Sequence, residues 1–259
     1  MPTLPGGLQL FAIPRGCQRF HGREGNKFQL SPTLFSLHEE VTVVKKNSNL
    51  TLKVYQRIIE LMLNYEIVPG QRLVFIDLAK QLGVSRTPVN NALSILAQEG
   101  YLDFVPNQGY SVHRLTRKEA ENLYDIREVL EVGFIGPAIR NMTDKKLQAV
   151  KKHKVDYEKA ISTHVDRKLF ILDTEFHAGI LDMVSNDILS SRYRDICQKI
   201  FLRFRTEDLR LNRIMEIRDE HSELFEAIRL RDIERSKELV KLHHQNSRKN
   251  LFPIIFPNE

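Results

Sequence analysis

The chain has no tryptophan and only two cysteines, Cys17 and Cys197, among its 259 residues. The two cysteines are far apart and neither belongs to a CxxC motif, so neither a disulfide framework nor a cysteine-bound zinc site is predicted. A reducing compartment, the cytoplasm, is expected. Long apolar runs are also missing, because the early run at residues 8–13 is much too short to span a membrane and lacks the flanks of a secretory signal. We therefore expect no membrane partner.

Positive charge is concentrated in one part of the chain. The formal net charge is +6, and residues 45–118 contain ten Lys/Arg against five Asp/Glu. A solvated basic surface would have the same composition, but such a concentration also favours a polyanionic partner. Nucleic acid is one such partner, and the sequence motifs described next bear on this prediction.

Three regions follow one another. Residues 1–44 hold five of the twelve glycines and four of the ten prolines without a sustained apolar period, which predicts a disordered arm. Residues 45–115 predict a winged helix-turn-helix domain, and residues 116–252 predict a helical domain for effector binding and dimerisation. The fold class expected is mainly α, with one small β-hairpin wing and an all-α bundle at the C-terminal end.

Helical spacing and turn residues locate the elements of the smaller domain. A first helix over residues 50–65 ends at a Val-Pro-Gly turn, and Asp77 is expected to cap or open a short helix that stops before Gly83. Ser85 is the expected N-cap of a second helix that runs to about Glu99. Residues 101–105 and 109–115 alternate like two strands of a hairpin. For the bundle, the spacing predicts helices over residues 117–140, 144–160, 166–184, 187–205, 209–230 and 232–250.

The second helix of a helix-turn-helix lies in the major groove, so its first turns hold the candidate base contacts. Arg86 can pair with guanine, and the two asparagines can pair with adenine; the alternative is a surface salt bridge for Arg86 and solvated amides. The candidate DNA-binding residues are Ser85, Arg86, Thr87, Asn90 and Asn91 on this helix, Asn107, Gln108 and Gly109 at the wing tip, and Lys53 and Arg57 on the first helix.

Chelating side chains recur on three predicted helices of the bundle. Asp173 and His177 are four residues apart and lie in an apolar stripe, where a carboxylate is costly unless it is paired or coordinated. His221 lies in a second such stripe and His243 in a third, whereas His244 falls closer to Lys237. One histidine alone is more simply a hydrogen-bonded core residue. Together the four predict a site for a divalent transition metal, Zn, Ni, Mn or Fe, with about two positions open in an octahedral shell.

The strings "VPGQRL", "DLAKQLGVSRTPVNNALSILAQEGYL" and "NQGYSV" closely resemble the hallmark of the GntR superfamily. The resemblance implies a transcriptional regulator that binds a roughly palindromic double-stranded DNA operator as a homodimer. One departure bears on operator sequence and affinity, because the family usually has Arg-Glu where this chain has Asn90-Asn91.

The order "DIREVLE", "DTEFHAGI", "DEHSELFEAIRLRD" and a late "HH" resembles the FCD ligand-binding domain of the FadR subfamily. The resemblance implies that Asp173, His177, His221 and His243 ligate the metal. Arg127 and Glu131 also match family positions, although an i,i+4 salt bridge would explain them equally well. Arg127, Arg203 and Arg205 are the candidate contacts of a small organic acid effector.

The function expected is that of a regulator, a repressor by the commoner family behaviour, whose operator affinity changes when the effector binds. Two alternatives stay open: a purely structural or sensed metal, and a metal-dependent hydrolase fused to a DNA-binding domain. Neither an HExxH motif nor a carboxylate placed as a general base is found in the sequence, so an enzyme is not expected.

Overall fold

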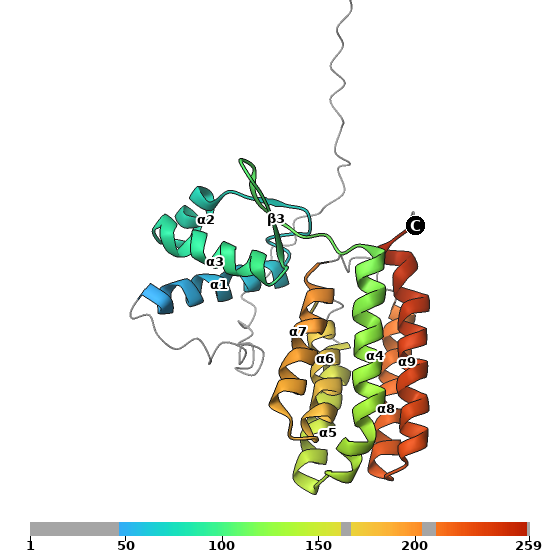
Figure 1. Cartoon of the computed structure of the whole chain (residues 1–259). Helices are drawn as coiled ribbons and strands as arrows, with labels where there is room; N and C mark the ends of the chain where they lie inside the picture. The colour runs from blue at the N-terminus through green and yellow to red at the C-terminus, as the bar shows by residue number, and fades with distance from the viewer. Residues whose placement is uncertain (1–46, 162–166, 204–210, 258–259) are drawn as a thin grey trace, which may run out of the picture. The chain divides into compact units, whose positions relative to one another are not determined.

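The computed structural model describes residues 47–161, 167–203 and 211–257. The arm predicted at residues 1–44 lies outside them. The described chain is mainly helical, with three helices and a small sheet over residues 47–112, followed by the six helices of a bundle (Figure 1). The helices of both parts follow the order expected from the sequence.

The helix-turn-helix is built on the buried face of its three helices, α1 (Asn47–Leu63), α2 (Phe75–Leu82) and α3 (Arg86–Gln98). Helix α1 contacts α3 through apolar residues such as Ile58, Met62 and Leu93, which are fully buried. Gly83 ends α2 with a positive φ of 66°, a conformation that favours glycine because side chains with a Cβ are strained there. This turn directs the chain into α3.

Two expected helix starts differ in detail from the structure. Helix α2 begins at Phe75, so Asp77 lies inside its first turn, where an acidic side chain is favourable at the positive end of the helix dipole, and does not cap it. Ser85 occupies the N-cap of α3 in an extended conformation, as expected, but its side chain makes no capping hydrogen bond.

The wing is a three-stranded antiparallel sheet rather than a simple hairpin. Strands β2 (Leu102–Val105) and β3 (Gly109–Val112) pair as expected, and a two-residue strand β1 (Arg72–Leu73) adds to the other edge of β3, giving the order β1-β3-β2. Asn107 and Gly109 have positive φ angles of 63° and 84° at the turn. The sequence pattern missed β1 because two residues are too few to show alternation.

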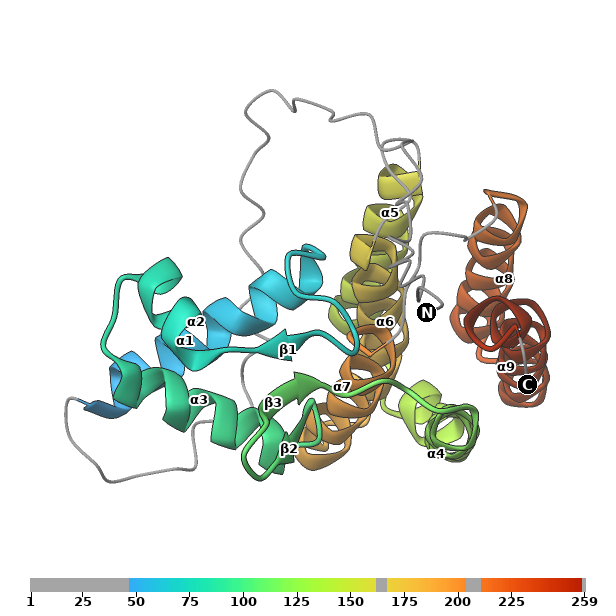
Figure 2. The ribbon, with the colours of Figure 1, turned by 90° about the horizontal axis from the view of Figure 1, so that it is seen from above.

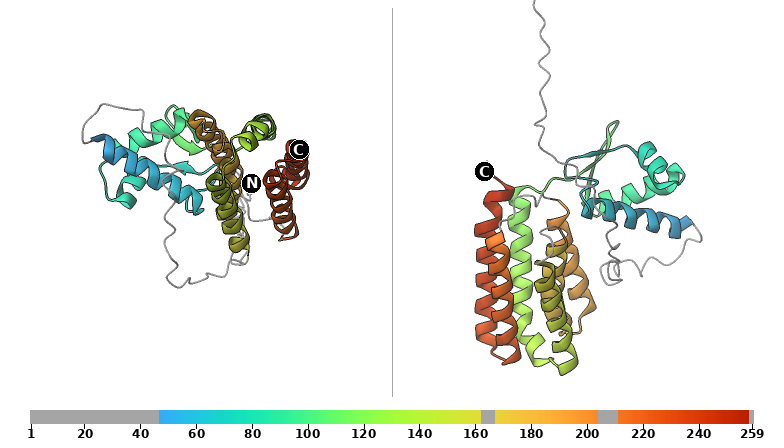
Figure 3. Two further views of the ribbon diagram at one scale, coloured as in Figure 1. Left: turned by 90° about the horizontal axis from the view of Figure 1, so that it is seen from below. Right: turned by 180° about the vertical axis from the view of Figure 1, so that it is seen from behind.

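The bundle consists of α4 (Arg117–Arg140), α5 (Asp144–Ile161), α6 (Arg167–Asp182), α7 (Asp187–Phe201), α8 (Leu211–Arg229) and α9 (Ile233–Ile255). Contacts run around a closed ring in the order α4, α9, α8, α5, α6, α7 and back to α4, and α6 also touches α4. Figure 2 shows the pair α8 and α9 side by side, and Figure 3 shows α9 beside α4 from behind. Side chains pointing inward from several helices therefore meet in the middle of the ring.

Most bundle helices begin and end within two residues of the expected positions. Helix α7 is shorter than expected and ends at Phe201, while α9 continues past residue 250 to Ile255 and includes Pro253. Leu251 and Phe252 are buried, so packing holds the last turn of α9 despite the proline. Among the described helices, none is long and apolar enough to cross a membrane.

Candidate functional site

Helix α3 divides into a buried face and a face open to a partner. Val89, Ala92, Leu93 and Leu96 are buried, whereas Ser85, Arg86, Thr87, Asn90 and Asn91 are all exposed. Among the described residues, Arg86 has no ion-pair partner, so the surface salt bridge considered above is not formed. The candidate base-reading side chains are therefore all presented together on one face of α3.

The other DNA candidates are also exposed, on two further elements. Lys53 and Arg57 project from α1, where Arg57 Nη1 forms an exposed ion pair with Glu60 Oε2 at 2.7 Å. Asn107 and Gln108 are exposed at the wing tip and Gly109 is half-buried. An exposed ion pair of this kind contributes little, so Arg57 can exchange Glu60 for a phosphate at small cost.

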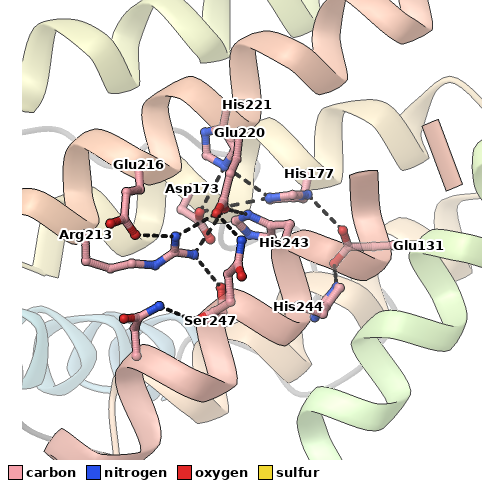
Figure 4. A network of polar contacts seen from close by, with 12 residues as sticks. Glu131, Asp173, His177, Arg213, Glu216, Glu220, His221, His243, His244 and Ser247 are labelled. Carbon is pink, nitrogen blue, oxygen red and sulfur yellow. Dashed lines mark hydrogen bonds and ion pairs between the residues drawn. The ribbon is translucent and has the colours of Figure 1, made fainter. Parts of the chain in front are cut away.

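The four predicted metal ligands converge in the middle of the bundle. Ligand atoms of Asp173, His177, His221 and His243 all lie within 4.8 Å of one another, and Figure 4 shows their side chains pointing toward one another from α6, α8 and α9. The Nε2 atoms of His177 and His221 are 3.2 Å apart, and Asp173 Oδ1 is 3.2 Å from His221 Nε2. Two nitrogens bound at right angles to one ion, each about 2.1 Å from it, are about 3.0 Å apart. The residues present therefore fit a divalent metal.

One buried and one half-buried carboxylate orient two of these histidines. His177 Nδ1 lies 2.8 Å from Glu131 Oε2, and His243 Nδ1 lies 2.7 Å from Glu220 Oε2. A carboxylate beside Nδ1 keeps the proton on that nitrogen and leaves a lone pair on Nε2, the arrangement that histidine ligands of metals usually have. The histidine Nε2 atoms are thus prepared to bind a cation.

Three of the four groups have pKa shifts that favour the metal-binding form, whereas the pKa of His177 is raised because Glu131 outweighs the effect of burial. Burial lowers the pKa of His221, and burial lowers that of His243 to about 4 although Glu220 opposes the shift. Burial by itself would raise the pKa of Asp173, but the hydrogen bond from His221 and the nearby histidines bring it well below its usual range. A neutral imidazole and an ionised carboxylate are the forms in which these groups bind a metal.

Both supporting carboxylates have several further partners. Glu131 Oε1 accepts a hydrogen bond from Tyr193 Oη at 2.6 Å and lies 3.0 Å from His244 Nε2. Glu220 accepts from both terminal nitrogens of Arg213, at 2.7 and 3.1 Å, and from Asn246 Nδ2 at 2.7 Å. Each carboxylate is thereby held in one position, which in turn holds the imidazole that it contacts.

A cavity of about 280 Å³ adjoins the cluster, and Asp173 and His243 form part of its wall. Arg127 also lines it: the side chain is buried, Nη2 donates to Tyr193 Oη at 3.1 Å and lies 3.9 Å from Asp173 Oδ2. Within the described residues, Arg127 Nε has no hydrogen-bond partner. The cavity wall therefore contains two candidate metal ligands and a guanidinium with an unused donor.

Comparison with known families places both parts of the chain. Residues 50–112 match the profile of the bacterial regulatory proteins of the gntR family, and residues 122–246 match the FCD domain. The chain belongs to the GntR family. It carries an FCD domain after its helix-turn-helix, and it is a transcriptional regulator of that family.

Relatives agree with the assignment to the GntR family, and a solved structure shares the fold. The HTH-type transcriptional regulator YdhC of Bacillus subtilis (strain 168) is 28% identical over 208 residues, which are 79% of this chain and 92% of the relative. The Nta operon transcriptional regulator of Aminobacter aminovorans is 30% identical over 137 residues, 53% of this chain and 65% of the relative. The structure of E. coli McbR/YncC superposes with a TM-score of 0.69 at 22% identity, over 79% of this chain and 98% of that one. A structural likeness at this identity shows the fold alone.

In this GntR-family chain, only one of the two described candidate effector residues lies at the cavity. Arg127 borders the cavity, but Arg203 Nη2 donates to Glu119 Oε1 at 2.8 Å, and Arg203 is not among the described residues that line it. Arg203 is therefore not brought to the cavity, because it follows the end of α7 by two residues and its side chain reaches the first turn of α4. Arg205 lies outside the described residues.

Sequence reasoning missed several groups around the FCD cluster. Glu220, Tyr193 and Arg213 were not singled out. His244, which we expected to fall nearer Lys237, is fully buried against Glu131. The adjacent histidines of "HH" were the one available signal, since each has a carboxylate partner on a different neighbouring helix.

Proposed function

We propose that this chain is a repressor whose affinity for a DNA operator is controlled by a small carboxylate effector bound at a divalent metal. Asp173, His177, His221 and His243 would hold the metal, which would supply a Lewis-acidic cation beside the cavity. The observation that carries the proposal is the pair of carboxylate contacts that direct Nε2 of His177 and His243 toward the cluster. Zinc, nickel, manganese and iron all suit this donor set.

The effector would lie in the adjoining cavity with its carboxylate toward the metal cluster. Four protein ligands leave about two positions open in an octahedral shell, and a carboxylate can fill them. Arg127 would donate its unused Nε–H to the same carboxylate, since guanidinium and carboxylate pair with favourable geometry. A small organic acid is the ligand class that these groups share.

Control of DNA binding would arise by linkage. Suppose that the effector binds more tightly to one arrangement of the two DNA-binding domains in a dimer than to the other. Effector binding then changes the free energy of operator binding, by about 1–3 kcal/mol in typical cases. The operator would be read by the exposed face of α3, with Lys53, Arg57 and the wing tip near the phosphates. The site of action proposed is the cytoplasm.

The test is operator affinity of the metal-loaded full chain with and without a panel of small organic acids, measured by fluorescence anisotropy. At least one acid is expected to change the dissociation constant about 5- to 150-fold, which corresponds to the coupling above. Chelation of the metal is expected to abolish that change. An operator affinity that follows the free metal concentration and ignores every acid would instead support the sensed-metal alternative.

The hydrolase alternative is less well supported. Besides Asp173, two carboxylates lie next to the cluster. Glu131 is bonded to Tyr193 and His244, and Glu220 is bonded to Arg213. Neither carboxylate is therefore free to accept a proton from water as a general base does. The two relatives described above, from Bacillus subtilis and Aminobacter aminovorans, are named as transcriptional regulators. Hydrolysis of esters by wild type, lost in His221→Ala, would be needed to revive this alternative.

Homodimerisation is part of the proposal, and helix α4 supplies a surface for it. Ile126 and Val129 are 46% and 71% exposed on this helix. Val129→Arg is expected to shift the protein from dimer to monomer in sedimentation velocity, because a charge would then be buried in an apolar contact. Ile188→Arg is the matched control, since Ile188 is 74% exposed on α7. A dimer that persists in Val129→Arg would place the interface elsewhere.

A further inference from the structure

The cavity beside the candidate metal cluster differs sharply in chemistry along its wall. Asp173, His243 and Arg127 form its polar end beside the cluster, and further polar side chains in the wall are Thr174, Arg213, Ser247, Lys249 and Asn250. Much of the remaining wall is aliphatic or aromatic, and includes Tyr157, Leu169, Ile200, Ile214, Ile217 and Leu251. An occupant that uses both parts must be amphipathic.

The apolar residues all lie on the same side of the metal cluster. Leu169 is four residues before Asp173 on α6, Ile217 is four before His221 on α8, and Leu251 is eight after His243 on α9. Helix α8 runs antiparallel to its neighbour α9 after a short turn, so these displacements point toward one end of the bundle (Figure 1). At about 1.5 Å per residue, the apolar wall extends about 6–12 Å from the cluster.

The volume limits the size of the occupant. An apolar cavity of about 150 Å³ accommodates benzene, so one of about 280 Å³ accommodates about eleven non-hydrogen atoms. A carboxylate bound at the cluster accounts for three of these about eleven non-hydrogen atoms. The remaining atoms would form the part of the effector that contacts the apolar wall.

From this geometry we infer that the effector is a monocarboxylate with an aryl or alkyl body, rather than a sugar acid or a dicarboxylate. The inference rests on the proposed function, because it assumes that the carboxylate binds at the metal cluster. Hydroxyl groups of a sugar acid would lose their bonds to water against a wall of aliphatic side chains. A second carboxylate would need a free cation inside the cavity. Of the two other cations in the wall, Arg213 is already paired with Glu216 and Glu220, and Lys249 is exposed to solvent.

The test is calorimetric titration of the metal-loaded full chain with four probes. These are 3-phenylpropanoate, 3-phenylpropan-1-ol without the carboxylate, propanoate without the apolar body, and gluconate as a polyhydroxy acid. 3-Phenylpropanoate is expected to bind at least about tenfold more tightly than each of the others, because propanoate and gluconate lack the aromatic ring and 3-phenylpropan-1-ol lacks the carboxylate.

Ile217→Thr tests the wall itself. It places a hydroxyl in the apolar wall and removes the terminal methyl group of the isoleucine, so it is expected to weaken 3-phenylpropanoate at least about fivefold while leaving propanoate affinity and metal content unchanged. Ile233→Thr is the matched control, since Ile233 is a half-buried isoleucine packed against the bundle core and not on the cavity wall. Equal weakening by both substitutions, or none by Ile217→Thr, would overturn the inference.

The remaining outcomes separate this inference from the proposed function. If gluconate or succinate, titrated in parallel, binds more tightly than 3-phenylpropanoate, the inference on effector class is wrong and a carboxylate sensor remains. If the chain retains its metal but binds none of these acids, both the inference and the effector part of the proposed function are wrong. A chain that binds 3-phenylpropanoate equally well without metal would contradict the metal part alone.

Discussion

Purified Asp173→Ala and His221→Ala proteins are expected to lose the divalent metal that the wild-type chain retains at about one equivalent. Each substitution removes a donor from a set whose atoms lie within 4.8 Å of one another, and this set has no fifth member among the described residues. A metal present at about 100 times its dissociation constant stabilises the folded state by about 2.7 kcal/mol, or about 5–10 °C in melting temperature for a chain of this size. Elemental analysis and thermal melts with and without chelator measure both effects.

The design includes a control and a graded variant. His153→Ala removes a partly buried histidine of α5 that is outside the cluster, so metal content is expected to stay at the wild-type level. Glu220→Gln keeps the four donors but weakens the contact that orients His243, and is expected to lower metal affinity about 10- to 100-fold.

Glu216→Gln is the matched control for Glu220→Gln, because Glu216 also contacts Arg213 but not His243. Equal metal affinity in the wild-type and Glu220→Gln proteins would show that the orienting contact is unimportant. Full metal content in Asp173→Ala would show that the metal, if any, binds elsewhere. Circular dichroism of the chelated proteins separates loss of metal from loss of fold.

The four candidate donors could be found from sequence because each lies in the apolar stripe of its own helix. The stripe places a side chain toward the core but does not say which other helix it meets there. Glu220 shows the limit: it is adjacent to His221 in the chain and so points about 100° away around α8, yet it reaches His243 on the neighbouring helix. Such a contact depends on how α8 and α9 pack against each other.

His244 shows a second limit. The apolar stripe of α9 predicts that His243 points into the core and that His244 points to the side. This prediction would be correct for a helix that packs against the protein through one face only. Helix α9 contacts both α8 and α4, so His243 is buried toward Glu220 and His244 toward Glu131. The helices themselves were predictable because their apolar period depends only on local spacing, whereas the ends of α7 and α9 depend on tertiary packing.

Arg86→Ala is expected to weaken binding to the specific operator about 5- to 150-fold, or about 1–3 kcal/mol, and to relax preference at the base pair that it reads. The side chain is exposed at the start of α3 beside Thr87 and has no ion-pair partner in the described chain, so removing it costs the free protein nothing. The operator is first obtained by selection from a random duplex library, and affinities are then measured by anisotropy over a range of salt concentrations.

Lys53→Ala is the informative comparison, because Lys53 is exposed on α1 and is expected to contact phosphate only. Its loss should weaken binding to specific and random duplexes alike, while base preference stays the same. The slope of the logarithm of the binding constant against the logarithm of the salt concentration should fall in magnitude by about one unit. Asn90→Ala, on the exposed face of α3, should behave like Arg86→Ala and change preference at a different position. If Arg86→Ala instead weakens all duplexes equally, as Lys53→Ala does, then α3 positions the protein on the backbone and the base-reading contacts lie on another element, such as the wing tip at Asn107 and Gln108.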